Sequence, residues 1–286
     1  MARGWKIALV VFLSVIISNA VLVVTLGIIY IDDKNIQYQN FVINHSTDKD
    51  TNLKIVHLSD LHFPQIHVNL DAMLNRIQQE APDIIAITGD IVGTRSTIET
   101  SGVYEFVERL VLIAPVYYVN GNHEVNNNGG WSLYNGLEER GVILLRNRHV
   151  NIEIGDVTVT LIGLFDGPYG LPFYTPAIYK NEDISNNYII LLVHNPRLIW
   201  PQVTENLRAI APDLILAGHV HGGQIRIFGK GILCPDRIFF PSFQNGMYSA
   251  ENERDTNMIV SRGLGNSIVP FRFNNKPHIP LIKVLF

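Results

Sequence analysis

The sequence is poor in two features that would narrow its class. It has one cysteine, Cys234, in 286 residues, so no disulfide can form within the chain and stability must come from the core. Lys and Arg number 22 against 26 Asp and Glu, for a net charge of −4. Non-specific nucleic-acid binders neutralise phosphates with a basic excess, which this composition lacks. We therefore expect no nucleic-acid partner, whereas the cysteine count leaves the compartment open.

Charge is also missing from the first apolar run. No charged residue lies within residues 7–31, which can span a hydrocarbon core of about 30 Å at a helical rise of about 1.5 Å per residue. Arg3 and Lys6 precede the run, and Asp32 and Asp33 follow it. By the positive-inside tendency, this pattern predicts a single-pass protein of the cell membrane with a cytoplasmic N-terminus and the rest of the chain outside the cytoplasm.

A cleaved signal peptide is the rival interpretation of this run. Its small-residue cleavage site would be Ser18-Asn19-Ala20. Ten more apolar residues follow that site, and cleavage would leave them exposed at the new N-terminus. An uncleaved signal anchor is therefore the preferred interpretation.

The chain is predicted to have three parts. Residues 1–31 are the cytoplasmic tip and transmembrane anchor, residues 32–52 are a juxtamembrane connector with an edge strand, and residues 53–286 are one large domain. In this domain strand and helix signals alternate, which predicts an α/β fold. Apolar residues recur at helical spacing within residues 70–77 and 103–111. Buried strands are predicted at residues 53–59, 84–88, 116–119, 188–193 and 214–217.

One stretch of the domain is echoed in another. Ala81-Pro82-Asp83 precedes the strand that ends at Gly89-Asp90, and Ala211-Pro212-Asp213 precedes the strand that ends at Gly218-His219. The echo indicates two similar units that deliver side chains to one cleft. The alternative is that Pro-Asp is simply a favourable turn before a strand.

Candidate metal ligands follow the five predicted strands, at the point where each strand ends. Carboxylate, amide and imidazole groups suit a hard or borderline divalent ion, and α/β proteins place their sites at strand ends. A single Asp-x-His or His-x-His pair is not specific, but the ordered series is. The series is Asp60, His62, Asp90, Asn122 with His123, His194, His219 and His221.

This series resembles the calcineurin-like metallophosphoesterases, whose pattern runs D-x-H, G-D, G-N-H-[DE], H and G-H-x-H. Every position is filled, and the resemblance extends from Leu53 to the C-terminus. Residues 218–225 (GHVHGGQI) and 261–265 (SRGLG) are similar to a bacterial group of membrane-anchored or exported phosphoesterases. The resemblance implies a four-layer αββα sandwich of two mixed β-sheets, with a dinuclear metal site at the strand ends.

The resemblance also implies a role for each ligand. Asp60, His62 and His221 would hold the first metal, Asn122, His194 and His219 the second, and Asp90 would bridge the two. Two divalent ions about 3.5–4 Å apart can trap a bridging hydroxide and neutralise phosphate oxygens, which predicts in-line attack on a phosphate ester. The ions could be Mn, Fe, Zn, Co or Ni.

Four further residues are assigned from their positions. His123 is the candidate for proton donation to the leaving group as an imidazolium, and Arg262 is the candidate for clamping a substrate phosphate through its planar fork. Glu124 could orient a ligand or lie in a solvated loop, and the loop is slightly preferred. His57 lies inside a predicted strand and is expected to be structural.

Two segments are rich in aromatic residues, namely residues 167–179 and 238–248. They could lie against the bilayer interface or line a pocket for an acyl or isoprenoid chain. The preferred expectation is that they pack against their own domain as ordered loops.

We therefore expect a membrane-anchored phosphoric ester hydrolase that acts on a phosphodiester or pyrophosphate, with a lipid- or nucleotide-linked substrate as the candidate. A phosphomonoesterase or protein phosphatase would use the same cluster, and the charge balance disfavours a nuclease. A non-catalytic scaffold predicts lost ligands, whereas all seven ligand positions are filled. Residue spacing decides neither between monoester and diester nor the oligomeric state.

Overall fold

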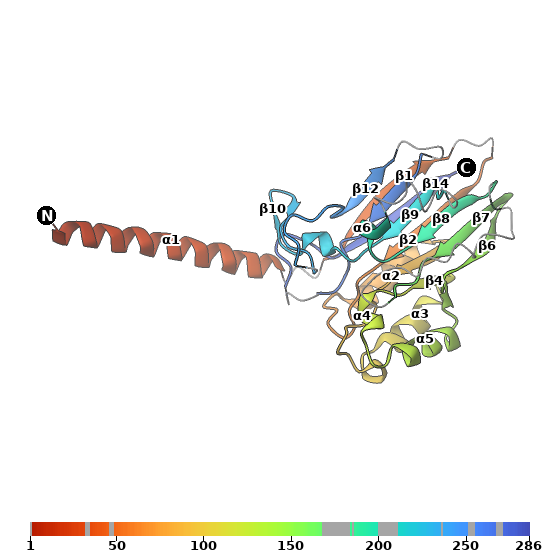
Figure 1. The fold of residues 1–286 in the computed structure, drawn as a ribbon, viewed down its shortest axis with the longest axis horizontal. Helices are drawn as coiled ribbons and strands as arrows, with labels where there is room; N and C mark the ends of the chain where they lie inside the picture. The colour runs from red at the N-terminus through yellow and green to blue at the C-terminus, as the bar shows by residue number, and fades with distance from the viewer. Residues whose placement is uncertain are drawn as a thin grey trace.

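The computed structural model describes residues 2–31, 35–45, 49–167, 184, 186–199, 211–235, 237–250, 255–266 and 271–286. Within these residues, two six-stranded sheets form a sandwich (Figure 1). The first sheet has the order β1 (Gln37–Asn44), β14 (His278–Leu285), β2 (Asn52–Leu58), β3 (Ile84–Thr88), β4 (Val116–Val119) and β5 (Ile143–Leu144). The second has the order β12 (Gly246–Ser249), β13 (Asn257–Val260), β9 (Leu214–Ala217), β8 (Tyr188–Leu192), β7 (Val157–Gly163) and β6 (Arg148–Ile154).

Both sheets are mixed. Strands β2 to β5 run parallel, and β14 is antiparallel to β2. In the second sheet β13, β9, β8 and β7 run parallel, and antiparallel strands β12 and β6 flank them. The predicted α/β sandwich of two mixed sheets is confirmed, and the five strands read from the sequence are β2, β3, β4, β8 and β9, with ends that differ by at most one residue.

Three apolar clusters explain why these segments form layers. The central strands are buried on both faces, as in β3, which reads as a continuous apolar run. Side chains of both sheets, such as Val119 and Leu161, form the core between them. On the outer face of the first sheet, α2 (Leu70–Glu80), α3 (Val103–Leu110) and α5 (Gly130–Glu139) bury their apolar stripes. On the outer side of the second sheet lies a third cluster, which includes Ile162, Ile189 and Ile215. The short helix α6 (Pro196–Ile199) follows β8.

The N-terminal helix α1 (Ala2–Ile31) projects away from the sandwich (Figure 1). Its segment Trp5–Thr25 is long and apolar enough to cross a membrane, and none of it is buried against the rest of the chain. Strand β1 follows and pairs in parallel with β14 at the edge of the first sheet, with Gln37 opposite His278. The edge strand β1 is therefore part of the first sheet of the domain that follows it.

The sequence echo corresponds to one local structure that is used twice. Ala81 and Ala211 both adopt left-handed backbone angles, with φ of 46° and 41°. The Asp83 side chain accepts a hydrogen bond from the Lys54 amide at 2.8 Å, and the Asp213 side chain accepts one from the Ile189 amide at 2.7 Å. Each aspartate thus ties the start of its strand to the neighbouring strand, so the echo is more than a favourable turn.

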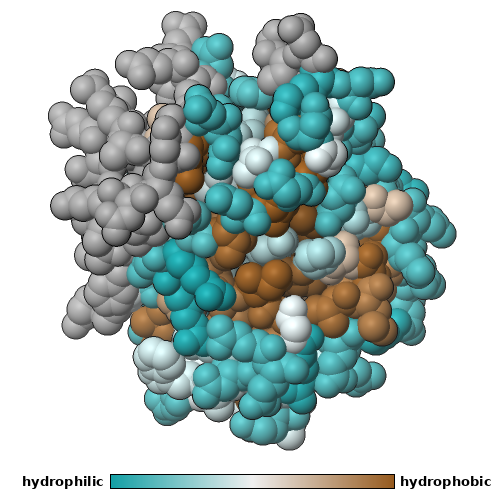
Figure 2. All heavy atoms as spheres, turned by 90° about the vertical axis from the view of Figure 1, so that its right-hand side faces the viewer, coloured by the Kyte–Doolittle hydropathy of each residue, from teal (hydrophilic) through white to brown (hydrophobic). Residues whose placement is uncertain are grey.

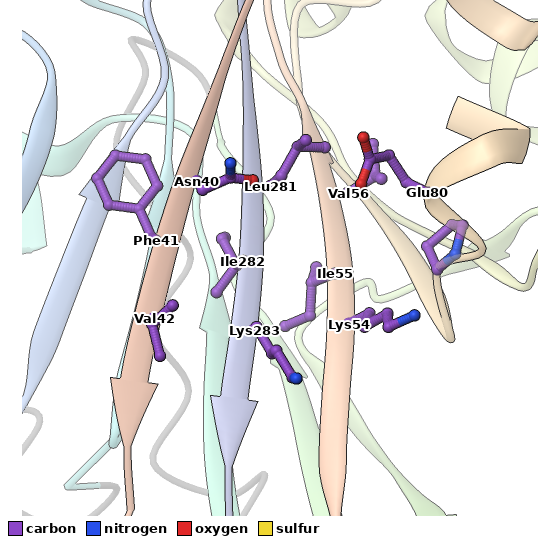
Figure 3. Close-up of a pocket in the computed structure, with 11 residues that line it drawn as sticks. Asn40, Phe41, Val42, Lys54, Ile55, Val56, Glu80, Leu281, Ile282 and Lys283 are labelled. Atoms are coloured by element: carbon purple, nitrogen blue, oxygen red, sulfur yellow. The ribbon is translucent and has the colours of Figure 1, made fainter. Parts of the chain in front are cut away.

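Two further features lie away from the strand ends that carry the candidate metal ligands. The end of the sandwich opposite α1 shows apolar side chains in its middle, surrounded by hydrophilic ones (Figure 2). A pocket of about 350 Å³ lies across β1, β14 and β2, where Lys283 lies between Val42 and Lys54, and Leu281 and Val56 lie beside them (Figure 3). None of the clusters of potential metal ligands among the described residues lines this pocket.

Two buried histidines support the first sheet. His57 is fully buried, and its Nε2 lies 2.8 Å from the Thr88 hydroxyl, as expected for a structural histidine. His278 is also fully buried: its Nδ1 accepts a hydrogen bond from the Arg262 amide at 3.2 Å, and its Nε2 lies 3.1 Å from Gln39 Oε1. Burial lowers the pKa of His57 to about 3 and that of His278 to about 2. Both rings are therefore neutral in the folded chain.

These two histidines predict a loss of stability in acid. Their folded pKa values lie below the ordinary value of 6.5, so unfolding takes up protons as the pH falls below 6.5. The free energy of unfolding, measured in detergent by urea titration of the metal-free chain, should fall by up to about 1.4 kcal/mol per pH unit for each histidine. His278→Asn keeps an acceptor for the Arg262 amide but no longer titrates. The decrease of the free energy of unfolding per pH unit should therefore be smaller by the contribution of one histidine. The same slope in this variant and in the control His67→Asn, at an exposed residue, would contradict the prediction.

Candidate metal centre

The candidate ligands follow the carboxyl ends of parallel strands. Asp60 follows β2, Asp90 follows β3, His194 follows β8 and His219 follows β9, each two residues beyond its strand. Asn122 begins the short helix α4 (Asn122–Val125) after β4. Because parallel strands of each sheet end at the same edge, the sandwich brings these side chains to one place.

The backbone at this place is strained. Five of the candidate ligands adopt left-handed backbone angles, with φ between 50° and 70°, a region that residues other than glycine rarely occupy. They are Asp60, His62, Asp90, His219 and His221. Backbone hydrogen bonds between the loops hold this conformation, from the Asp60 amide to Gly89 and from the His62 amide to Asp90, both at 3.0 Å. Strain of this kind persists only where the surroundings enforce it, and it commonly marks a functional site.

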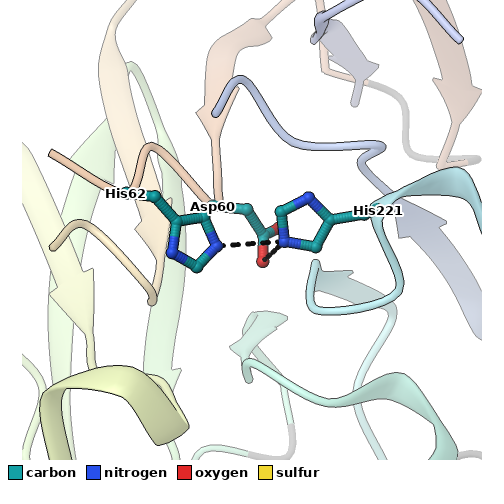
Figure 4. A group of neighbouring side chains, drawn as sticks. All are labelled: Asp60, His62 and His221. Carbon is teal, nitrogen blue, oxygen red and sulfur yellow. Dashed lines mark hydrogen bonds and ion pairs between the residues drawn. The ribbon is translucent and has the colours of Figure 1, made fainter. Parts of the chain in front are cut away.

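One cluster consists of Asp60, His62 and His221 (Figure 4). His62 Nε2 lies 3.0 Å from His221 Nε2, which in turn lies 3.3 Å from Asp60 Oδ1. All three side chains are buried. The backbone approaches closely as well, since a Cβ on Gly218 would collide with the Ser59 hydroxyl and the Asp60 carboxylate.

A second cluster consists of Asp90, His194 and His219. His194 Nε2 lies 3.2 Å from Asp90 Oδ2, 3.1 Å from His219 Nδ1 and 3.2 Å from Asn122 Oδ1. Asp90 Oδ2 also lies 3.8 Å from His62 Nε2 of the first cluster. The Asp90 carboxylate is thus situated between the two clusters.

The protonation of these groups fits a cation site. Burial lowers the pKa of His62, of His221 and of His219, the last to about 3, so these rings are neutral and keep a free lone pair. Burial alone would lower the pKa of His194, but the carboxylates of Asp90, Asp60 and Asp166 together outweigh burial and raise that pKa. Two imidazole nitrogens 3.0 Å apart need a proton or a metal ion to relieve lone-pair repulsion. Neutral imidazoles converging on carboxylates are the donor set that divalent metals prefer.

Glu124 lies beneath the second cluster and is 1% exposed, so the expectation of a solvated loop was wrong. Its Oε2 accepts hydrogen bonds from the amides of Asp90 at 2.9 Å and Gly121 at 2.7 Å, and its Oε1 accepts one from Val92 at 3.0 Å. Burial, followed by the Asp90 charge, raises the pKa of Glu124 to about 8, while the amides act in the opposite direction. Glu124 thereby fixes the loop that carries Asp90 against the one that carries Asn122.

His123 lies at the edge of the second cluster, with 19% of its side chain exposed. Its amide donates to Asp90 Oδ1 at 2.8 Å, and its Nε2 lies 3.8 Å from Asp90 Oδ2. The Thr94 amide donates to Nδ1 at 3.1 Å, so Nδ1 is an acceptor and the neutral ring carries its proton on Nε2. An imidazolium would place two N–H groups against each other at this contact. The role expected for His123 as a proton donor to the leaving group stays a prediction.

A cleft of about 360 Å³ opens above His62 and His123. The described residues that line it are His62, Gln65, Gly93, Thr94, Arg95, His123 and Asn266. Arg262, the residue expected to clamp a phosphate, is not among them, because it is 6% exposed and donates to Gln37 Oε1 at 2.7 Å. The exposed guanidinium in the cleft belongs to Arg95.

Sequence reasoning did not single out three residues that contact the site. Arg95 and Thr94 follow Asp90 on the same loop. Their closeness in sequence to a candidate ligand could have marked this cation and this hydroxyl as site residues. Arg272, which is 4% exposed, lies behind the first cluster with its Nη2 3.2 Å from His221 Nδ1. No motif marks Arg272, because 51 residues separate it from His221.

The two aromatic-rich segments have different outcomes. Residues 168–179 of the first lie outside the described residues. In the second, Phe243 stacks edge-on with Tyr248 at 5.2 Å, as expected for an ordered loop. Phe239 and Phe240 are each 68% exposed, so the preferred expectation that this segment packs on its own domain fails for them.

Comparison with known proteins agrees with this geometry. A family model described as calcineurin-like phosphoesterase matches residues 53–223. The uncharacterised metallophosphoesterase YkoQ of Bacillus subtilis (strain 168) is 29% identical over 232 residues, which cover 79% of this chain and 82% of YkoQ. The phosphodiesterase YaeI of Escherichia coli (strain K12) is 26% identical over 244 residues, which cover 83% of this chain and 84% of YaeI. The crystal structure of a dimetal phosphatase from Danio rerio aligns with a TM-score of 0.47 at 12% identity, covering 75% of this chain and 88% of that one.

The contacts of Glu124 generate a prediction. At pH 9, where the Glu124 carboxyl is ionised, Glu124→Gln replaces one acceptor oxygen with a donor that faces an amide N–H, so a buried hydrogen bond is lost and two donors oppose each other. The free energy of unfolding should fall by about 1–3 kcal/mol, as measured by urea titration. The matched control is Glu139→Gln, at an exposed residue of α5, which should change stability by less than about 0.5 kcal/mol. Equal stability of the two variants would count against a role for Glu124 in holding the loops.

Proposed function

The chain belongs to the calcineurin-like phosphoesterases, metal-dependent hydrolases of phosphoric esters, and we propose that it hydrolyses a phosphodiester or pyrophosphate at a membrane surface. The observation that carries the proposal is the position of the Asp90 carboxylate between two buried clusters of imidazoles and carboxylates. A diester is favoured because the relative YaeI is named a phosphodiesterase.

The proposed ligand sets follow the two clusters. Asp60, His62 and His221 would hold one divalent ion, Asn122, His194 and His219 would hold the other, and the Asp90 carboxylate would be available to both. Two divalent ions bound here would supply a Lewis acid for phosphate oxygens and would lower the pKa of bound water. Among the proposed ligands, only Asp60 and Asp90 carry negative charge, because Asn122 is neutral. The four positive charges of two divalent ions would therefore be only half compensated by their ligands. The excess positive charge would draw a phosphate ester into the cleft.

The chain's own residues would orient and complete the reaction. His123 faces the cleft, and the Thr94 amide fixes its proton on Nε2, from which it can donate a hydrogen bond to the departing oxygen. Arg95, exposed in the same cleft, can pair with a second phosphate oxygen through its planar guanidinium. We assign to Arg95 the substrate-binding role that the sequence had suggested for Arg262.

The membrane location is part of the proposal. The apolar segment Trp5–Thr25 supports a single-pass anchor, and the charges on either side of it support a cytoplasmic N-terminus with the domain on the opposite side. A lipid-linked phosphate ester would reach such a domain without leaving the membrane, and a nucleotide-linked one would reach it from solution. A monoesterase or protein phosphatase remains the alternative, since the same ligand sets serve both reactions.

The hydrolase is tested with the full chain in detergent, loaded with Mn²⁺. We expect metal-dependent turnover of bis-p-nitrophenyl phosphate in preference to p-nitrophenyl phosphate. Asp90→Ala removes the shared ligand and should lower turnover at least about a hundredfold, with loss of bound metal measured by mass spectrometry. The control is Asp71→Ala, since the Asp71 carboxylate is 77% exposed and pairs with Arg109 on the outer helices.

Three outcomes of this experiment differ in meaning. Preference for the monoester would favour the alternative activity. Turnover that persists in Asp90→Ala would refute the shared-ligand assignment. A wild-type chain that binds no divalent metal would refute the dinuclear site.

The cleft generates a prediction for Arg95. Arg95→Gln removes the guanidinium from the substrate phosphate and should raise KM about tenfold while kcat changes less than about threefold, because this contact is made before and during the reaction. Arg76→Gln serves as a control, since Arg76 is half-exposed on α2 and pairs with Glu80. An unchanged KM in Arg95→Gln would remove this residue from the substrate site.

A further inference from the structure

An exposed apolar surface lies beside the metal centre. It is formed by the hairpin of β10 (Arg226–Ile227) and β11 (Lys230–Gly231) and by the loop after it. Phe228 at the hairpin tip is 99% exposed, and Phe239 and Phe240 are each 68% exposed. Ile227 and Ile238 are exposed by 46% and 43%. We call these five residues the aromatic platform.

The platform is held in a costly conformation. Phe228 and Phe240 adopt left-handed backbone angles, with φ of 50° and 52°. A bulky residue at positive φ is strained, and here the strain presents aromatic rings to solvent, where they contribute nothing to the core. Strain without a benefit for folding indicates a role in binding.

The platform is attached to the loop that carries the last two candidate ligands. His221 begins the short helix η5 (His221–Gly223), and the amides of Ile232 and Leu233 both donate to the carbonyl oxygen of Gly223 at 3.2 Å. The Phe240 amide donates to Ile232 at 2.8 Å, which joins the second part of the platform to the first. Whatever binds the platform is therefore held close to the metal centre.

The membrane anchor enters the domain at the same end. Strand β1 begins at Gln37 opposite His278, whose amide donates to Gly263 at 3.0 Å. A Cβ on Gly263 would lie 2.6 Å from Cβ of Asp60, so this end of the sheet adjoins the first cluster. Five residues, 32–36, separate α1 from β1, and a chain of this length spans at most about 20 Å. Figure 1 shows the domain end of α1 and the β10 hairpin on the same side.

Charge complements this placement. The sequence from Arg226 to Phe240 contains the cations Arg226, Lys230 and Arg237 against one acid, Asp236. Lys230 and Arg237 are exposed beside the apolar residues. Aromatic rings accompanied by cations are typical of segments that sit among the headgroups of anionic lipids.

We propose that the aromatic platform docks on the headgroup region of the same bilayer that holds α1, and that its occupant is an anionic phospholipid surface. This inference rests on the proposed membrane anchor. Docking would turn the metal-centre end of the sandwich towards the membrane, so that a phosphate ester at headgroup depth can enter the cleft. The short tether makes this contact intramolecular and raises its effective concentration.

A fluorescent label tests the docking in the full chain. In a Cys234→Ala background, where the buried native thiol is gone, Phe228→Cys is labelled with the polarity-sensitive dye NBD, and Leu112→Cys is the matched control. Leu112 is 86% exposed at the end of α3, remote from the platform in sequence. The chains are reconstituted into phosphatidylcholine vesicles with about a quarter phosphatidylglycerol, with and without brominated acyl chains.

We expect the label at position 228 to shift to shorter wavelength and to lose about half its emission to brominated lipid, with neither effect at position 112. Phe239→Cys should behave like Phe228→Cys. Agreement of the two positions would show that the result does not come from a disturbance of the hairpin tip by the label at position 228. Metal-dependent hydrolysis of bis-p-nitrophenyl phosphate verifies the fold of each labelled chain.

Other outcomes would overturn the proposal in distinguishable ways. A label at 228 that stays as solvent-exposed as the one at 112, in chains that float with the vesicles, would refute docking and leave the anchor intact. A shift without quenching by brominated lipid would place the platform on protein, such as a second copy of the chain. Chains that do not float with vesicles would refute the anchor, and docking with it, whereas hydrolysis in detergent would be unaffected.

Discussion

The structure depends on one buried carboxylate, that of Asp90, held between two groups of imidazole side chains. Its two oxygens serve different purposes: Oδ1 accepts the His123 amide, and Oδ2 faces His194 at 3.2 Å and His62 at 3.8 Å. A buried charge is unfavourable unless it is compensated, so the arrangement is stable only where cations or protons neutralise it. The two divalent ions of the proposed site would meet that requirement.

Much of the surrounding fold serves to hold this carboxylate in position. Parallel strands bring the loops to one edge, and inter-loop hydrogen bonds keep Asp60, His62 and Asp90 in left-handed conformations. Glu124 then receives amides from both the Asp90 loop and the α4 loop. The two cores on either side of the first sheet offset the strain, because their apolar burial does not depend on the loops. Site precision thus comes from rigid sheets and stability from the layers around them.

The proposed placement of the site relative to the membrane follows from topology. Strand β1 begins at the sheet end that bears the metal ligands, so α1 joins the domain at that end. The hairpin of the aromatic platform begins at Arg226, five residues after His221. A domain tethered through its far end would present the cleft to solvent. Here the tether and the exposed aromatic rings both favour a cleft that faces the bilayer.

The amino-acid sequence by itself determined the strands, the apolar N-terminal helix and the ordered series of donors, because periodicity, charge and strand-end position are local properties. The tertiary structure alone decided which side chains face the cleft. Glu124 is buried, and Arg262 donates a hydrogen bond to Gln37. The guanidinium exposed in the cleft is that of Arg95. The proton position on His123 was also beyond the sequence. Each of these depends on atoms far away along the chain, such as Thr94 near His123, and distant contacts are set only when the two sheets pack.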